Sequence, residues 1–244
     1  ERSRAGVKLT SDGVLLLPFA KTMCLEYQML QNQIDALNEL QSGLIRIGTI
    51  SSVATHWLPR IIKAFQKDFP GIDYELLLGD YSEIEAWIME GRVDCGFLIE
   101  PAHPDLESIF LGQDKLLAVL PMDHPLAELD RVPIQALCEQ PFMLLDRSGR
   151  SEVKEIFSHY GIVPKVKFRT WDDYAIMSMV ESGLGVSILP QLILQRVPYR
   201  IVAKELDVPA YREICLALRS RQTASHAVKR FLEYLAHRYE IEGV

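Results

Sequence analysis

The stretch that decides the fold begins with a short apolar strand, Gly43-Leu-Ile-Arg-Ile-Gly48, and continues into a hydroxyl-rich turn, Thr49-Ile-Ser51-Ser52. Apolar residues at helical spacing come next, and helix and strand then alternate over residues 58–69, 72–78, 81–90 and 93–98. Strands that alternate with helices of this length predict an α/β fold with a parallel sheet covered on both faces. Ligands of such sheets bind outside the carboxyl ends of the strands, so we expect the functional site there.

Polar residues and turns follow the ends of these first strands: Ser51, Ser52, Asp80 and the turn at Ile99-Glu100. Ser51 and Ser52 precede a helix start, where free backbone N–H groups and the helix dipole favour an anion. Capping of that helix by one of the hydroxyls is an equal alternative. Asp80 has the same two interpretations, and as a ligand contact its carboxylate would favour a hydrogen-bond donor or a positive group.

Composition places the chain among ordinary globular proteins. Its 244 residues are 48% hydrophobic and 24% charged, its longest apolar run is far shorter than the roughly 20 residues of a bilayer span, and no signal segment opens it. Cys24, Cys95, Cys138 and Cys215 are scattered without a C-x-x-C pair, which favours reduced thiols in a cytoplasmic protein without a membrane partner. Because the chain begins at Glu1 rather than Met, we expect its beginning to be missing.

The charge is distributed unevenly. A net charge of −7 argues against nucleic-acid binding by the bulk of the chain. At its start, however, Arg2, Arg4 and Lys8 outnumber Glu1. A basic end on an acidic body indicates contact with a polyanion at that end, although solvated surface charge explains it equally well.

A long helix is predicted from Thr10, its N-cap, to Gln41. Its apolar residues recur in steps of four and three, the a/d seam of a coiled coil: Leu16, Ala20, Met23, Tyr27, Leu30, Ile34 and Leu37. Packing on its own domain would also explain an amphipathic helix. The regular seam favours a dimerisation helix that connects two domains.

The alternation of strand and helix restarts in the second half, with strands predicted at residues 141–146 and 163–169. Candidate ligand contacts follow the ends of these strands: Asp146, Arg147, Ser148, Thr170 and Trp171. Arg147 has the forked geometry that binds a carboxylate or phosphate, although a surface arginine is the commoner state. Thr170 is also the predicted N-cap of the helix over 171–182, and Trp171 is more often a packing residue.

Two predicted strands connect the halves, one near residues 115–120 and one over 212–218, and a closing helix follows over 223–239. This is the organisation of a two-lobed small-molecule binder with a cleft between its lobes. The hydroxyls, Arg147 and a helix N-terminus make a small carboxylate-bearing metabolite the favoured effector. Asp80 counts against that choice.

Catalytic and cofactor motifs are absent from the sequence. Gly183-Leu-Gly185 lacks the third glycine of a dinucleotide fingerprint, no G-x-x-x-x-G-K or H-E-x-x-H occurs, and Ser148 and Ser187 lack the G-x-S-x-G context. The six histidines never fall at metal-ligand spacing. We therefore expect no enzyme activity, no cofactor and no metal site.

Over practically its whole length the sequence resembles the LysR-type transcriptional regulators. The resemblance is carried, in order, by residues 1–13, Leu16-Leu-Pro-Phe-Ala20, Leu44-Ile-Arg-Ile-Gly48, Trp57-Leu-Pro59, residues 65–70, Gly91-Arg-Val-Asp-Cys-Gly96 and Gly183-Leu-Gly-Val-Ser-Ile-Leu-Pro190. No single segment is decisive, but the ordered set is highly specific.

The resemblance implies a domain organisation. Residues 1–9 would be the wing remnant of a winged helix-turn-helix, with Arg2, Arg4 and Lys8 near DNA, and residues 10–42 the linker and dimerisation helix. A two-lobed, periplasmic-binding-protein-like effector domain with two crossover strands would follow, with lobe I at 43–116 plus 213–244 and lobe II at 117–212. Ser52 and Asp80 would then contact the effector.

The sequence thus predicts a ligand-responsive transcriptional regulator that senses a small molecule in its cleft. It would bind DNA through the missing N-terminal domain and form a homodimer or homotetramer. One alternative is a solute-binding protein of a transporter, which shares the two-lobed plan but needs export and no long helix. An enzyme of the same plan is the other.

Overall fold

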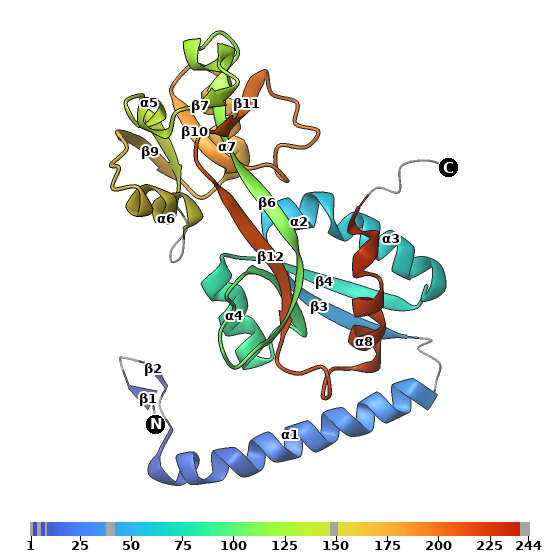
Figure 1. Cartoon of the computed structure of the whole chain (residues 1–244). Helices are drawn as coiled ribbons and strands as arrows, with labels where there is room; N and C mark the ends of the chain where they lie inside the picture. The colour runs from blue at the N-terminus through green and yellow to red at the C-terminus, as the bar shows by residue number, and fades with distance from the viewer. Residues whose placement is uncertain (1, 4–5, 8, 38–41, 147–150, 240–244) are drawn as a thin grey trace.

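The computed structural model describes the chain except residues 1, 4–5, 8, 38–41, 147–150 and 240–244. It opens with the antiparallel pair β1 (Arg2–Ser3) and β2 (Gly6–Val7), followed by the helix α1 (Ser11–Leu37). The Thr10 hydroxyl accepts a hydrogen bond from the Gly13 N–H at 3.0 Å, which confirms the predicted start of this helix. In Figure 1, α1 lies outside the two-lobed body and approaches it at α8.

Lobe I begins with the alternating unit that the sequence predicts. Its elements are β3 (Gly43–Thr49), α2 (Ser51–His56), α3 (Leu58–Asp68), β4 (Ile72–Leu78), α4 (Tyr81–Glu90) and β5 (Cys95–Ile99). The strands β4 and β5 both pair with β3 in parallel, so the predicted parallel sheet is confirmed. Trp57 separates α2 from α3, and Pro59 lies in the first turn of α3, where a missing N–H breaks no helical hydrogen bond.

Two long strands, β6 (Glu107–Pro121) and β12 (Tyr211–Leu218), run between the lobes side by side (Figure 1). The sequence predicts a connecting strand near residues 115–120, whereas β6 is longer and begins at Glu107. Its first part pairs with β12 and its last part with β10 and β11. The sheet therefore continues through both lobes in the order β4-β3-β5-β12-β6-β10-β8-β9.

Lobe II repeats the alternating plan on the far side of these strands. Its elements are η1 (Pro125–Glu128), β7 (Arg131–Val132), α5 (Ile134–Cys138), β8 (Phe142–Leu145), α6 (Glu152–His159), β9 (Val166–Thr170), α7 (Asp173–Glu181), β10 (Val186–Pro190) and β11 (Ile201–Leu206). The prediction that Thr170 caps the helix after β9 is wrong. Thr170 is the last residue of β9, and Asp172 caps α7 because its carboxylate accepts from the Tyr174 and Ala175 N–H groups.

The chain closes on lobe I with α8 (His226–Glu233) and η2 (Leu235–Arg238). The single closing helix predicted over 223–239 is therefore wrong in its bounds. The Ser225 hydroxyl accepts from the Val228 N–H at 3.2 Å and starts α8 there. The helix ends at Glu233, and its C-cap Tyr234 precedes the shorter η2.

Each lobe has its own apolar core. In lobe I, Phe65 of α3 meets Phe231 of α8 edge to face, with ring centroids 5.6 Å apart. In lobe II, separate clusters form around Phe142 and around Met177. The lobes thus pack as two bodies joined by β6 and β12, and the predicted boundaries at residues 116 and 212 stay a prediction. Within the described residues, no helix has the length and apolarity that a bilayer crossing requires.

Candidate functional site

An inner cavity of about 50 Å³ lies between the lobes, beside the crossover strands. Its lining comes from both lobes and from β6 and β12: Ile50, Ser51, Ser52, Asp80, Tyr81, Leu116, Leu145, Ser151, Glu152, Val153, Asp173, Ile188, Pro190 and Arg212. Three of these residues, Ser51, Ser52 and Asp80, are among those that the sequence predicts. The carboxyl ends of the lobe I strands therefore do face the cleft, as expected of this fold.

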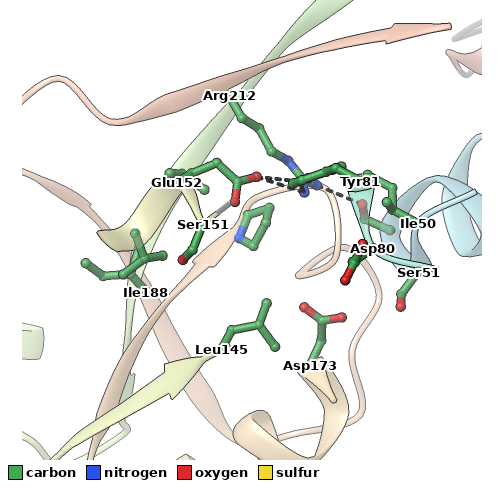
Figure 2. Close-up of a pocket in the computed structure, with 14 residues that line it drawn as sticks. Ile50, Ser51, Asp80, Tyr81, Leu145, Ser151, Glu152, Asp173, Ile188 and Arg212 are labelled. Atoms are coloured by element: carbon green, nitrogen blue, oxygen red, sulfur yellow. Dashed lines mark hydrogen bonds and ion pairs between the residues drawn. The ribbon is translucent and has the colours of Figure 1, made fainter. Parts of the chain in front are cut away.

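Arg212 of β12 lies in the wall of this cavity, and Figure 2 shows its guanidinium between Glu152 and Tyr81. Its guanidinium donates to the Asp114 carboxylate of β6 at 2.7 and 2.9 Å and to the Ser52 hydroxyl at 2.7 Å. Its side chain is only 6% exposed. Burial alone would lower the pKa of Arg212, but Tyr81, Asp114 and Glu152 around it hold that pKa above its ordinary value, so the guanidinium stays charged.

Tyr81 and Glu152 meet across the cleft on top of Arg212. Tyr81 is the first residue of α4 in lobe I, and Glu152 is the first residue of α6 in lobe II. The Tyr81 hydroxyl accepts from Arg212 at 3.0 Å and donates in a very short contact to the Glu152 carboxylate. Burial raises the pKa of Tyr81 well above its ordinary value. The phenol is therefore neutral and supplies the proton of this contact between the lobes.

An outer groove of about 460 Å³ continues from the inner cavity. It is lined by Ser51, Leu78, Gly79, Asp80 and Glu83 of lobe I and by Asp146 and Trp171 of lobe II. Ser51 and Asp80 line both spaces, so the cavity and the groove are neighbours between the lobes.

Asp80 and Asp146 supply carboxylates to this groove from opposite lobes. Asp80 is the N-cap of α4 in a reciprocal capping box with Glu83, so the capping role proposed for it from the sequence is confirmed. Asp146 pairs with Lys154 at 2.5 Å and Arg169 at 3.1 Å. The hydrogen bond from Lys154, reinforced by Arg169, lowers the pKa of Asp146, so it lines the groove as a carboxylate.

The other residues predicted to contact the effector lie in several different places. Trp171 lines the groove and is 70% exposed as a residue. Thr170, next to it, accepts from the Asp172 N–H and does not belong to the lining of the cavity or the groove. Ile99 lines another depression, which Glu152 and Arg212 also line. Arg147 and Ser148 lie outside the described residues.

At the N-terminal end, the structure places Arg2 in β1, while Arg4 and Lys8 lie outside the described residues. The alternative reading of Ser51 and Ser52 as helix caps is wrong. Ile50 is the N-cap of α2 and no side chain caps it. Ser52 is buried and accepts from Arg212 instead.

Sequence reasoning missed the polar residues that line the inner cavity or bond to its lining: Tyr81, Asp114, Ser151, Glu152, Asp173 and Arg212. Arg212 and Asp114 carry charges inside the two crossover strands. Charge alone does not single them out, because a second charged residue follows each of them in the same strand. Asp114 and Arg212 are 98 residues apart in the sequence, so no local pattern reveals that they pair. Figure 2 shows Asp80, Glu152 and Asp173 around the same space.

Comparisons with known proteins agree with this architecture. Residues 38–240 match the family model described as the LysR substrate binding domain. The HTH-type transcriptional regulator YvbU of Bacillus subtilis is 29% identical over 94% of this chain and 79% of its own length.

Solved structures of this family have the same fold. HinK, a LysR family transcriptional regulator from Pseudomonas aeruginosa, matches with a TM-score of 0.71 and 25% identity over 94% of this chain and 82% of its own. The regulatory domain of CcmR from Synechocystis, solved in complex with 2-PG, matches with a TM-score of 0.75 and 23% identity over 83% of this chain and all of its own. The chain described above belongs to the LysR-type transcriptional regulators, and its two lobes are the ligand-binding part of that family.

Proposed function

We propose that this regulator binds its effector in the outer groove, with the inner cavity as the deep end of the same cleft. The observation that carries the proposal is that Ser51 and Asp80 of lobe I and Asp146 and Trp171 of lobe II line one groove. A ligand that contacts both lobes binds most tightly when the lobes are close together, so its binding shifts the equilibrium toward that arrangement. The relative CcmR, solved with a small molecule bound in its regulatory domain, supports this assignment.

The described lining favours an effector that carries hydrogen-bond donors and an apolar face. Asp80, Glu83 and Asp146 line the groove with carboxylates, while Leu78 and the Trp171 ring supply apolar surface. The carboxylate-bearing effector expected from the sequence relied on Arg147, which lies outside the described residues. It stays a prediction, and the charge of the described lining does not support it.

We further propose that α1 dimerises the regulator and that the end of the chain carrying β1 and β2 faces DNA in a cytoplasmic protein. Apolar residues of the predicted seam are exposed on α1, with Met23 at 73% and Leu30 at 57%. Exposed apolar side chains at this spacing are stabilised by pairing with a second helix. A tetramer would need a further contact that involves the lobes.

A ligand screen by thermal shift tests the effector site. The panel holds amines, amino acids and small carboxylates, each at several concentrations, because a ligand that binds only the folded state raises its stability by about 2.7 kcal/mol at a hundred times the dissociation constant. A ligand of the cleft should bind the Asp80→Asn variant at least about tenfold more weakly, since it loses a charged hydrogen bond of about 1.5–3 kcal/mol.

The matched control is Asp172→Asn. Both aspartates are N-caps, and asparagine caps about as well as aspartate, so neither variant should lose its helix. Asp172 lies outside the lining of the cavity and the groove. A ligand that both variants bind as well as the wild type does would place the effector site elsewhere.

A further inference from the structure

Arg212 resembles the anchor of an anion site, yet four of its five N–H donors are already hydrogen-bonded within the protein. A guanidinium has five N–H donors. Two of them bond to Asp114, one to Ser52 and one to the Tyr81 hydroxyl. The fifth, on Nη1, belongs to the nitrogen that lies 3.7 Å from a Glu152 carboxylate oxygen.

Glu152 occupies the place that a bound carboxylate would take. Its carboxylate pairs with Arg212 and accepts the proton of the Tyr81 hydroxyl, two contacts with which proteins usually hold a ligand carboxylate. It reaches this place from lobe II, whereas Tyr81 and Ser52 reach it from lobe I. The side chain of Glu152 is 18% exposed, so it is largely withdrawn from solvent.

The size of the remaining space agrees with an occupied site. The inner cavity holds about 50 Å³, whereas small-molecule sites usually hold about 300–1,000 Å³. The outer groove has room of that order, about 460 Å³. The inner cavity therefore leaves little room for a small molecule beside Glu152.

We propose that Glu152 is a built-in occupant of an anion subsite formed by Arg212 and Tyr81, and that it excludes carboxylate ligands from this deep end of the cleft. At this end of the cleft an effector in the outer groove meets the carboxylates of Glu152, Asp80 and Asp173. These carboxylates select for an effector that carries a hydrogen-bond donor at that end. This consequence for selectivity depends on the proposed function. The occupancy itself does not.

Removal of the side chain and its replacement by a free ion test the occupancy. Glu152→Ala removes one methylene and the carboxylate, and acetate supplies the same heavy atoms. We expect the variant to melt below the wild type and acetate to raise its melting temperature, with chloride at equal ionic strength as the salt control. Acetate should bind the variant at least about tenfold more tightly than the wild type, the equivalent of one charged hydrogen bond.

Glu155→Ala is the matched control, because Glu155 lies one turn further along α6 with an exposed side chain. The proposal is overturned if acetate stabilises the wild type as much as Glu152→Ala, since Arg212 would then still be open to ligands. It is also overturned if acetate acts equally on Glu155→Ala, or if it does not stabilise Glu152→Ala at all.

Two precautions keep the result interpretable. If Glu152→Ala does not fold, as judged by near-ultraviolet circular dichroism, Glu152→Ser opens the same space and the acetate titration is repeated on it. The titration needs no knowledge of the effector. A failed effector screen therefore leaves the occupancy standing, and a failed rescue by acetate leaves the outer groove as the proposed effector site.

Discussion

Arg212 brings a positive charge between the lobes and is balanced there by Asp114 and Glu152. Taking charges out of water is costly, and the pair repays this cost only through its short hydrogen bonds. Removing one partner leaves the other buried without compensation. Arg212 therefore stabilises the fold mainly because it compensates buried carboxylates, and less through the net attraction within each ion pair.

Arg212→Met should lower the free energy of unfolding by about 3–5 kcal/mol, because Asp114 would remain buried without its partner. Urea denaturation followed by circular dichroism measures this loss. Arg221→Met is the matched control, since Arg221 pairs with Glu107 at the surface with its side chain 53% exposed, and such a pair contributes about 0–1 kcal/mol. Equal losses in the two variants would contradict this account of the cleft.

His56 introduces a pH dependence into the stability. It is buried at the end of α2, and burial together with the charge of Arg60 lowers its pKa below 6.5. The unfolded chain therefore binds a proton at a higher pH than the folded one does, and stability falls as the pH drops below about 6.5.

His56→Gln should remove this part of the pH dependence. The difference in unfolding free energy between wild type and variant should shrink as the pH falls from about 7 toward 5, and urea denaturation at each pH measures it. The exposed His103, changed to Gln, is the control. A difference that stays constant with pH would show that His56 does not titrate in this range.

At the scale of elements, α1 is unlike the helices of the lobes. It presents Met23, Tyr27 and Leu30 to solvent, all more than half exposed, whereas α3 and α8 bury Phe65 and Phe231. An apolar stripe of this kind is stabilised by a partner helix. The exposed apolar side chains of α1 therefore lack the packing that the helices of the lobes have.

Leu30→Glu should dissociate the α1 dimer, because it places a charge in the middle of the predicted seam. The molar mass in solution, measured by light scattering, should fall to that of a smaller assembly. Thr22→Glu adds the same charge at an exposed position outside the seam and should leave the mass unchanged. An unaltered mass for Leu30→Glu would exclude this helix as the dimer contact.

Local patterns predicted most of the elements for a simple reason. The apolar spacing of β3 to β5 and of the helices between them is set by which face each element buries, so alternation alone indicates a parallel sheet. The errors occur where short-range competition decides. Asp172 rather than Thr170 caps α7, and Ser225 starts α8, because several nearby side chains can cap and only the geometry of the chain selects one.

At the scale of the whole molecule, the lobes are connected in two ways. The strands β6 and β12 join them covalently and through the sheet. The contact between Tyr81 and Glu152 joins them across the cleft. Only the second can open without breaking the sheet, so we expect it to limit the relative motion of the lobes.

Tyr81→Phe should broaden the distribution of distances between the lobes. Pulsed electron paramagnetic resonance measures this distribution between two spin labels. The labels are attached to cysteines that replace the exposed Lys67 and Lys167, in a Cys24→Ser background. Tyr74→Phe is the matched control, because the buried Tyr74 hydroxyl has no hydrogen-bond partner among the described residues. Identical distributions for Tyr81→Phe and the wild type would mean that the strands alone hold the lobes.

The sequence by itself determined the two-lobed α/β plan, the long helix and the strand ends at Ser51, Ser52, Asp80, Asp146 and Trp171, because periodicity and turn residues are local properties. Only the tertiary structure decided what fills the cleft. Arg212 bonds to Ser52, which is 160 residues away in the sequence, and to Tyr81, which is 131 residues away. These side chains meet only because β12 returns beside β6 in the fold. The chemistry of the deep end of this cleft is therefore a property of the fold.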